Sequence, residues 1–333
     1  MKIGSCFSGV GAMDLAAELW WGGETVWFCE RDKYAAGVFR RHWLGVPVYG
    51  DVRTLVEDGA EPIDVLCGGP PCVDLSCAGR GAGLRAERSG LFFDFVAAAA
   101  ALQPKWVFIE NVPALLSKWR GTVEDALESA GYTSIVWAKV AAQHCGAPHK
   151  RARVFVLASR EGRTWGVCDA GPLPPVGRWP TPRATEHKAN GYQRKGDALF
   201  PTLTGAVGAA PRGPSQAVGW GAPTATQACG KLSPLWVETL QGLPVGWTDA
   251  EGESMRAEAM ATAHAPPWPA PMVKGMWGDS PQFDHEPPRV VIGKLANWSA
   301  RLRCLGNLNP PAQYLLAINL LHEGPRQQSL FSV

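Results

Sequence analysis

Short apolar runs alternate with helix-length segments through the first half of the chain. The runs cover residues 2–7, 25–29, 46–50, 63–67, 105–109, 134–141 and 154–158, and most of their positions are apolar. Continuous apolar runs of this length are typical of strands buried on both faces of a parallel sheet. Helices are expected between them, including one that ends near Trp21 and an alanine-rich one over 91–102. The pattern predicts a Rossmann-like α/β domain over residues 1–159.

Polar groups follow the first three predicted strands, at the sheet edge where α/β proteins bind ligands. Ser8-Gly9-Val10-Gly11 forms a glycine turn at the start of a helix, where free backbone N–H groups point toward a ligand. Glu30 ends the second strand, and a carboxylate there can accept hydrogen bonds from both hydroxyls of a ribose. Asp51 ends the third strand. Together these positions favour an adenosine-containing cofactor.

Cys72 follows the fourth predicted strand within the turn Gly69-Pro70-Pro71-Cys72. The next loop carries Arg80 and Arg85 among glycines, which gives it a positive charge suited to phosphates. A buried structural cysteine is the alternative interpretation, and it fits Cys67, inside the apolar run, better than Cys72. The pattern favours a nucleophile that acts on a nucleic acid.

Glu110 ends the strand over 105–109, so it is expected at the same sheet edge as Cys72, one strand along. A cysteine and a carboxylate at adjacent strand ends suit nucleophilic and acid–base chemistry. Arg151 and Arg153 alternate before the run 154–158, which predicts that both guanidinium groups lie on one face of the strand. A solvated basic face is the alternative, although arginine also binds phosphates and base oxygens.

The composition changes after Ser159. Residues 160–232 are rich in Pro, Gly and Thr and contain nine Lys and Arg against four Asp and Glu. A loop-rich basic module suits a DNA groove, although a disordered linker shares this composition. Residues 233–248 form a distinct segment in which 233–247 is predicted to be helical, and residues 249–290 are acidic and rich in Pro and Trp. We therefore expect a smaller irregular domain over 160–290, and a C-terminal segment, 291–333, whose helix returns to the first domain.

Composition also limits the protein class and its location. No apolar run is long enough to span a bilayer, and the N-terminus has no signal-peptide pattern. The nine cysteines contain no CxxC pair, which argues against a zinc site or a disulfide framework. The net charge of +2 does not discriminate between partners. We expect a reduced, cytoplasmic protein that binds neither a membrane nor a metal.

In combination, these motifs resemble the DNA (cytosine-5)-methyltransferases of bacteria and their phages, in the family's order and over nearly the whole chain. The similar stretches are residues 7–11 (first cofactor motif), 69–72 with Ser76 (catalytic Pro-Cys), 110–112 (Glu-Asn-Val), 149–153 (Gln-x-Arg-x-Arg), 240–247 (the end of the target-recognition region) and 306–311 (last motif). Val73 and His149 stand where glutamine is usual, and Ala12 replaces a glycine.

The resemblance implies a Rossmann-like S-adenosylmethionine-dependent methyltransferase domain with a smaller target-recognition domain. Cys72 would add to C6 of a flipped-out cytosine, Glu110 would hold N3 and the exocyclic amine, and Arg153 would hold O2, with Arg151 in support. The expected cofactor residues are Phe7, Ser8, Gly9, Gly11, Glu30, Asp51, Pro71, Leu91 and Asn307. The expected DNA-contacting residues are Ser76, Arg80, Arg85, Arg183, Arg194 and Lys195.

The resemblance further implies double-stranded DNA as the partner, a monomer, and a bacterial or phage-encoded protein. It leaves open whether the protein has a cognate restriction endonuclease as a further partner or is an orphan enzyme. A tRNA cytosine-5 methyltransferase is an alternative, because one branch of the family has that activity. A non-catalytic DNA-binding relative would have no need of Cys72, Glu110 and Arg153. An NAD-type dehydrogenase would share the first strand, turn and helix but leaves Pro71-Cys72 and Glu110-Asn111-Val112 unexplained.

Overall fold

An eight-stranded sheet forms the centre of the structure, a computed structural model that describes residues 1–71, 90–161, 166–173, 179–188, 192–195, 198–201, 203, 231–269, 283–291 and 295–323. The strand order is β3-β2-β1-β4-β5-β7-β6-β8. The strands are β1 (Lys2–Cys6), β2 (Glu24–Cys29), β3 (Val48–Tyr49), β4 (Val65–Gly68), β5 (Trp106–Asn111), β6 (Ser134–Ala141), β7 (Ala152–Ser159) and β8 (Gly166–Asp169). The α/β fold predicted from the sequence is confirmed.

Helices cover both faces of this sheet. The first helices are α1 (Ala12–Trp21), α2 (Lys33–His42), α3 (Gly90–Leu102) and α4 (Ala114–Ser129). Consecutive residues of β4 face opposite hydrophobic cores: Val65 and Cys67 lie in the core with α1, and Leu66 lies in the core with α3 and α4. Because both faces are buried, the strands read as continuous apolar runs, which is why the sequence reveals them.

Strand β7 runs against its neighbours. It pairs antiparallel with both β5 and β6, whereas β1, β2, β4 and β5 pair in parallel. The start of β7 therefore lies at the same edge of the sheet as the ends of β4 and β5. This reversal brings residues 151–153 to the edge that carries Glu110.

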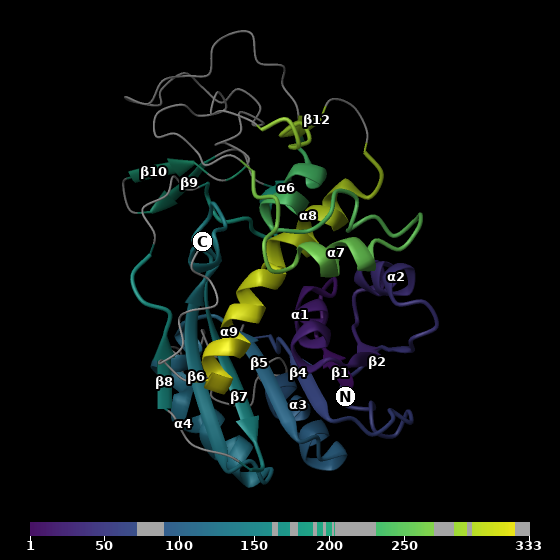
Figure 1. Cartoon of the computed structure of the whole chain (residues 1–333), viewed down its shortest axis with the longest axis vertical. Helices are drawn as coiled ribbons and strands as arrows, with labels where there is room; N and C mark the ends of the chain where they lie inside the picture. Colours follow the sequence, from purple (N-terminus) through teal and green to yellow (C-terminus); the bar gives the residue numbers. More distant parts are fainter. Residues whose placement is uncertain are drawn as a thin grey trace.

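A smaller group of elements lies above the sheet in Figure 1. It contains a two-stranded sheet of β9 (Tyr192–Lys195) and β10 (Ala198–Pro201) and another of β11 (Lys231–Leu232) and β12 (Val290–Val291). Its helices are α6 (Pro234–Leu240), α7 (Arg256–Thr262) and α8 (Trp298–Asn307), with a short 3-10 turn, η4 (Glu186–Lys188). A second 3-10 turn, η3 (Ala142–Cys145), follows β6 and packs against that strand. The chain then returns through α9 (Pro311–Glu323), which packs against α1, β6 and β7.

Two elements cross the expected boundary at residue 159. Strand β8 pairs with β6, so the sheet continues into the segment predicted to be irregular. Helix α7 packs on α1, and its Arg256 donates two hydrogen bonds to the buried Glu18 carboxylate, at 2.6 and 3.1 Å. Part of residues 249–290 thus lies against the first domain, and the division of the chain into domains stays a prediction.

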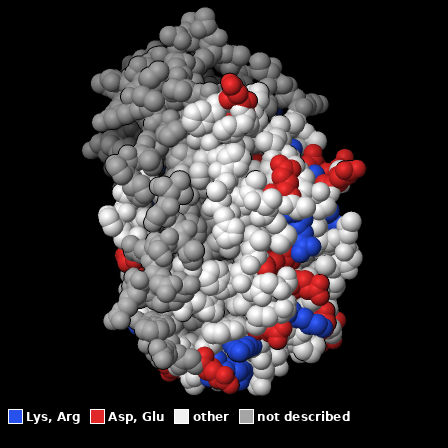
Figure 2. All heavy atoms as spheres, viewed as in Figure 1, with Lys and Arg blue, Asp and Glu red and all other residues white. Residues whose placement is uncertain are grey.

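The surface carries both signs of charge. Figure 2 shows Lys and Arg interspersed with Asp and Glu on the described part of one face, with uncharged residues between them. Mixed charge of this kind agrees with the small net charge of +2. Within the described ranges, no helix combines the length and the apolar character needed to cross a membrane.

Candidate active site

Glu110 and Arg153 meet at the edge where β5 ends and β7 begins. The Arg153 Nε atom lies 2.9 Å from Glu110 Oε1, and the two side chains are only 19% and 14% exposed. A carboxylate and a guanidinium group at this place supply acceptor oxygens and N–H donors side by side. The sequence predicted both residues for the site, and the antiparallel β7 brings them together.

The turn that leads to Cys72 runs beside Glu110. A Cβ atom on Gly69 would lie 3.2 Å from Glu110 Oε2 and 3.8 Å from the Phe7 carbonyl oxygen. Asn111 holds the turn from the other side, because its Nδ2 donates to the Pro70 carbonyl at 3.0 Å. Asn111 had no predicted role of its own, although it lies in the Glu-Asn-Val motif.

Pro71 is the last described residue before the predicted thiol. Four residues predicted for catalysis or DNA contact lie outside the described residues: Cys72, Ser76, Arg80 and Arg85. Asn111 holds the Pro70 carbonyl, and this contact fixes the chain just before these residues.

Arg151 is buried behind the site rather than exposed within it. It is 3% exposed, and it precedes β7 with a φ of 29°, so the alternation of a strand does not apply to it. Its Nε donates to Asn309 Oδ1 at 2.5 Å, and its Nη1 donates to the carbonyls of Pro182 and Gly306 at 3.1 and 3.2 Å. Burial lowers the pKa of Arg151 to about 9. Arg151 thus joins the start of β7 to the segments around Pro182 and Gly306.

His149, at the position where the family usually has glutamine, is completely buried. Its Nε2 lies 3.0 Å from the Leu240 carbonyl, at the end of α6. Burial, with a smaller contribution from the Arg151 charge, lowers the pKa of His149 to about 3, so the ring is neutral at pH 7. The neutral Nε2–H can donate to this carbonyl, and His149 therefore links β7 to α6.

A tight loop, residues 7–11, crosses the carboxyl end of β1, and we call it the cofactor loop. Phe7 and the two glycines have positive φ values, of 55° for Phe7, 63° for Gly9 and 88° for Gly11. The Ser8 hydroxyl lies 2.6 Å from the Ser5 hydroxyl. A Cβ atom on Gly9 would meet nothing within 4 Å, so a ligand can approach the backbone there.

Glu30 lies directly beside the cofactor loop. Its Oε2 accepts from the Gly9 N–H at 3.1 Å and its Oε1 from the Asp32 N–H at 2.8 Å. Burial raises the pKa of Glu30, while the Asp32 and Gly9 donors oppose that shift. A carboxylate has about four lone-pair positions. Each Glu30 oxygen can therefore accept a further hydrogen bond. These free acceptor positions and the open space at Gly9 fit the ribose of an adenosine-containing cofactor.

Three further predicted cofactor residues come from other segments of the fold: Asp51 follows β3, Leu91 lies on α3 and Asn307 lies on α8. Arg53 donates to both carboxylate oxygens of Asp51, at 2.9 and 2.5 Å, and lowers the pKa of Asp51 to about 2. Leu91 lies half-buried in the first turn of α3, and Asn307 is the exposed last residue of α8. The structure brings Phe7, Gly9 and Glu30 together, and it places Asp51 one strand farther along the edge.

Of the predicted DNA-contacting residues beyond the first domain, Arg183 is described in most detail. Its backbone lies against Gly306: a Cβ atom there would be 1.9 Å from the Arg183 carbonyl carbon and from the Ala184 nitrogen. Arg194 and Lys195 lie on β9, where they pair with Leu199 and Ala198 of β10. The entry to residues 184–305 is therefore held against α8, and β9 lies beyond it.

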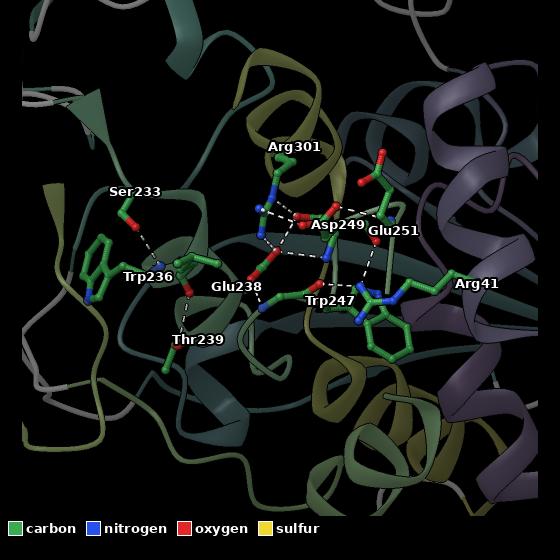
Figure 3. A network of polar contacts seen from close by, with 12 residues as sticks. Arg41, Ser233, Trp236, Glu238, Thr239, Trp247, Asp249, Glu251 and Arg301 are labelled. Atoms are coloured by element: carbon green, nitrogen blue, oxygen red, sulfur yellow. Dashed lines mark hydrogen bonds and ion pairs between the residues drawn. The ribbon is translucent and has the colours of Figure 1, made fainter. Parts of the chain in front are cut away.

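A buried polar network holds residues 238–249, which begin in the last turn of α6 and which we call the closing segment (Figure 3). Glu238 is 0% exposed and accepts from Arg301 Nη2 at 2.8 Å, from the Gly246 N–H at 2.6 Å and from the Thr248 N–H at 2.9 Å. The Thr248 hydroxyl is a fourth donor to Glu238. This network was not predicted, and its sequence signal is a charged residue, Glu238, inside a largely apolar helix.

Residues 1–204 match the family model described as C-5 cytosine-specific DNA methylase. Type II methyltransferase M.Bsp6I of Bacillus sp. (strain RFL6) is 33% identical over 165 residues, which are 48% of this chain and 52% of that protein. Type II methyltransferase M2.BsuMI of Bacillus subtilis (strain 168) is 37% identical over 169 residues, 48% of this chain and 42% of that protein. The chain thus spans about half the length of the curated relatives that it matches.

Among solved structures, an E. coli prophage protein described as a DNA modification methyltransferase matches with a TM-score of 0.52. The match covers 97% of this chain and 99% of that one, at 17% sequence identity. At this identity the likeness concerns the fold alone, and it extends over the sheet and the smaller group of elements together.

Proposed function

Because the chain belongs to the family of C-5 cytosine-specific DNA methylases, we propose that it methylates C5 of a cytosine within a specific double-stranded DNA sequence. The methyl donor is S-adenosylmethionine. The family relationship covers the part of the chain that carries the sheet, the cofactor loop, Glu110 and Arg153. A single observation carries the proposal: the Glu110–Arg153 pair lies beside Gly69, where the turn that leads to Cys72 begins.

The pair provides the groups that a cytosine ring needs. Cytosine C5 is a weak nucleophile until a thiolate has added to C6, and that addition requires the ring to be polarised. Arg153 would donate to O2 of the base, and Glu110, in its protonated form, would donate to N3 and accept from the exocyclic amine. Entry of the base would therefore replace the 2.9 Å contact between the two side chains by contacts to the ring.

Cys72 would be the nucleophile. Its thiolate would form a bond to C6, and the same bond would break after C5 has accepted the methyl group and lost its proton. A free thiol with a pKa near 8.5 is only about 3% thiolate at neutral pH, so nearby positive charge such as Arg80 and Arg85 would favour the reactive form. The target base must leave the duplex to reach this site, at a cost of a few kcal/mol.

The cofactor would be held at the edge of β1, β2 and β3. Glu30 would accept from the ribose hydroxyls, the backbone at Gly9 and Gly11 would approach the methionine end, and Phe7 would contact the adenine. When bound, S-adenosylmethionine supplies a methyl group activated by its sulfonium. Ser8, Asp51, Pro71, Leu91 and Asn307 complete the proposed pocket.

The DNA would lie between this edge and the smaller group of elements. Residues 160–290 would read the sequence, and Ser76, Arg80, Arg85, Arg183, Arg194 and Lys195 would contact the DNA. We further propose that the protein acts as a monomer in the bacterial cytoplasm, as a bacterial or phage-encoded enzyme. The Type II relatives support a cognate restriction endonuclease as a partner.

The test combines product mapping with a covalent trap. Bisulfite sequencing of DNA from cells that express the protein should show one methylated sequence, and Cys72→Ala should abolish the signal while calorimetry shows unchanged binding of S-adenosylmethionine. Duplex DNA with 5-fluorocytosine at the target should form a denaturation-resistant adduct, because the fluorine cannot leave as a proton. Methylation of tRNA but not of duplex DNA would refute the DNA assignment, and an active Cys72→Ala variant would refute the covalent mechanism.

A further inference from the structure

The peptide group between Val10 and Gly11 lies in the cofactor loop, and the local sequence restricts its orientation only weakly. Val10 stands between Gly9 and Gly11, and glycines accept many backbone conformations. The Val10 carbonyl and the Gly11 N–H belong to one planar trans peptide, so a hydrogen bond on the oxygen also fixes the direction of the N–H. That N–H donates to the Ser8 carbonyl at 3.1 Å and closes the turn.

The bond on the Val10 oxygen comes from the far end of the chain. Trp247 of the closing segment donates its indole N–H to this carbonyl at 2.9 Å, and both residues are 0% exposed. Trp247 also stacks on His42, with ring centroids 3.8 Å apart and planes 6° from parallel. The ring of Trp43, which packs under Gly11, meets Trp247 edge-on at 5.9 Å. The cofactor loop thus rests on an aromatic cluster that Trp247 completes.

Trp247 is itself held in place by the backbone around it. His42 accepts the Met255 N–H at Nδ1, at 3.1 Å, so its Nε2 carries the proton and donates to the Trp247 carbonyl at 2.9 Å. Arg41 donates to the carbonyls of Gly246 and Asp249 at 2.7 and 2.8 Å. Figure 3 shows Arg41 pointing into this part of the network. A donor fixed in this way loses little conformational freedom when it binds the loop, so its bond is effective in orienting the Val10 peptide.

We propose that Trp247 is a positioning residue for the cofactor, through the Val10 carbonyl. The inference rests on the proposed function, in that the cofactor loop must bind S-adenosylmethionine. It makes cofactor affinity depend on the closing segment, which lies at the end of the proposed DNA-reading region. Trp247 would contact neither the cofactor nor the DNA. It would fix the conformation of the cofactor loop, which contacts the cofactor.

The experiment compares two tryptophans that each donate an indole N–H to a backbone carbonyl. Trp247 donates to Val10, whereas Trp298 donates to Leu232 at 2.8 Å, away from the cofactor loop. Trp247→Phe removes the N–H and keeps an aromatic ring, and Trp298→Phe is the matched control. A third variant carries 3-benzothienylalanine at position 247, which keeps the shape of the indole and lacks only the N–H. Calorimetry without DNA measures the Kd for S-adenosylmethionine, and steady-state kinetics measure KM and kcat.

Loss of one buried hydrogen bond should raise the Kd for S-adenosylmethionine roughly five- to tenfold in both position-247 variants. KM for the cofactor should rise equally, while kcat at saturating cofactor and the Kd for DNA stay within about twofold. Trp298→Phe should leave the cofactor Kd at the wild-type value. If the benzothienyl variant binds the cofactor as tightly as wild type, the inference is wrong, whether or not Trp247→Phe folds. Wild-type protein that binds no S-adenosylmethionine would instead refute the proposed function itself.

Discussion

Replacing Glu238 by glutamine should destabilise the protein more than any exposed substitution in the same segment. The Glu238 carboxylate is fully buried and receives four hydrogen bonds, two from backbone N–H groups, one from the Thr248 hydroxyl and one from the Arg301 guanidinium. A glutamine keeps one acceptor oxygen. Its NH₂ group would then face donors on the side that a carboxylate oxygen now occupies, so at least one buried donor is left without an acceptor.

The size of the stability loss follows from the Arg301 charge, which stays buried when Glu238 is replaced. Arg301 is 3% exposed, and besides Glu238 it has the Thr248 hydroxyl at 3.1 Å and Asp249 at 3.8 Å. Breaking a buried ion pair from one side typically costs about 3–5 kcal/mol, because the partner charge stays buried without compensation. We expect Glu238→Gln to reduce the free energy of unfolding by about 3 kcal/mol or more. A Glu238→Gln/Arg301→Leu double variant should lose less than the sum of the single variants, with a coupling of about 2 kcal/mol or more.

Urea denaturation followed by tryptophan fluorescence measures these differences. Glu253→Gln is the control, since Glu253 is an exposed acid in the loop just beyond the closing segment and should change stability by less than about 0.5 kcal/mol. A loss below about 1 kcal/mol for Glu238→Gln, or a double variant that is simply additive, would show that the Glu238–Arg301 pair does not stabilise the closing segment as we infer.

Three further predictions concern other parts of the structure. Gly306→Ala should lose about 1–3 kcal/mol in the same denaturation assay, because the new Cβ meets the Ala184 nitrogen at 1.9 Å, whereas Gly121→Ala, with open space on α4, should be neutral or slightly stabilising. Burial lowers the pKa of His42 to about 4, so the unfolded chain binds this proton first, and the stability that depends on neutral His42 should fall by at most about 3 kcal/mol from pH 6.5 to pH 4. Buried His149, with a pKa of about 3, lowers stability over the same range, so His42→Gln should make the profile shallower by the His42 share and leave the His149 share. Arg194→Ala and Lys195→Ala should change DNA affinity or the methylated sequence, since base contacts are worth about 1–3 kcal/mol each, and unchanged DNA binding with weakened cofactor binding would contradict this.

The strands of the sheet could be predicted because their signal lies in consecutive residues of the sequence. Strands buried on both faces must be apolar throughout, so β1, β2, β4 and β5 are visible as runs, and the polar residues that end them are visible as interruptions. Glu30 and Glu110 were found in this way, and both lie at the predicted edge. The reversal of β7 is not local, because strand direction depends on the path of the chain outside the strand.

Arg151 shows where the pattern of a strand stops being informative. Alternation placed it on one face with Arg153, but a φ of 29° at Arg151 turns the chain just before β7. Its partners, Pro182, Gly306 and Asn309, are distant in sequence, and no local signal identifies them. Helix α6 similarly ends at Leu240, short of the predicted Trp247, where Gly242 with a φ of 68° and then Pro244 cannot continue it.

The contact of residues 183 and 184 with Gly306 bears on how such a protein can acquire a new recognition sequence. The chain departs toward β9 and re-enters through α8 at points that touch each other, so the intervening residues form a closed excursion with fixed ends. The entropy of closing a loop grows only logarithmically, and doubling the length of an excursion adds only about 0.6 kcal/mol. Apart from α6, the closing segment and α7, which are bound to α8, the cofactor loop and α1, the excursion can therefore be lengthened, shortened or exchanged between homologous proteins while the geometry of β5 and β7 stays unchanged, provided that the small residue at 306 is kept.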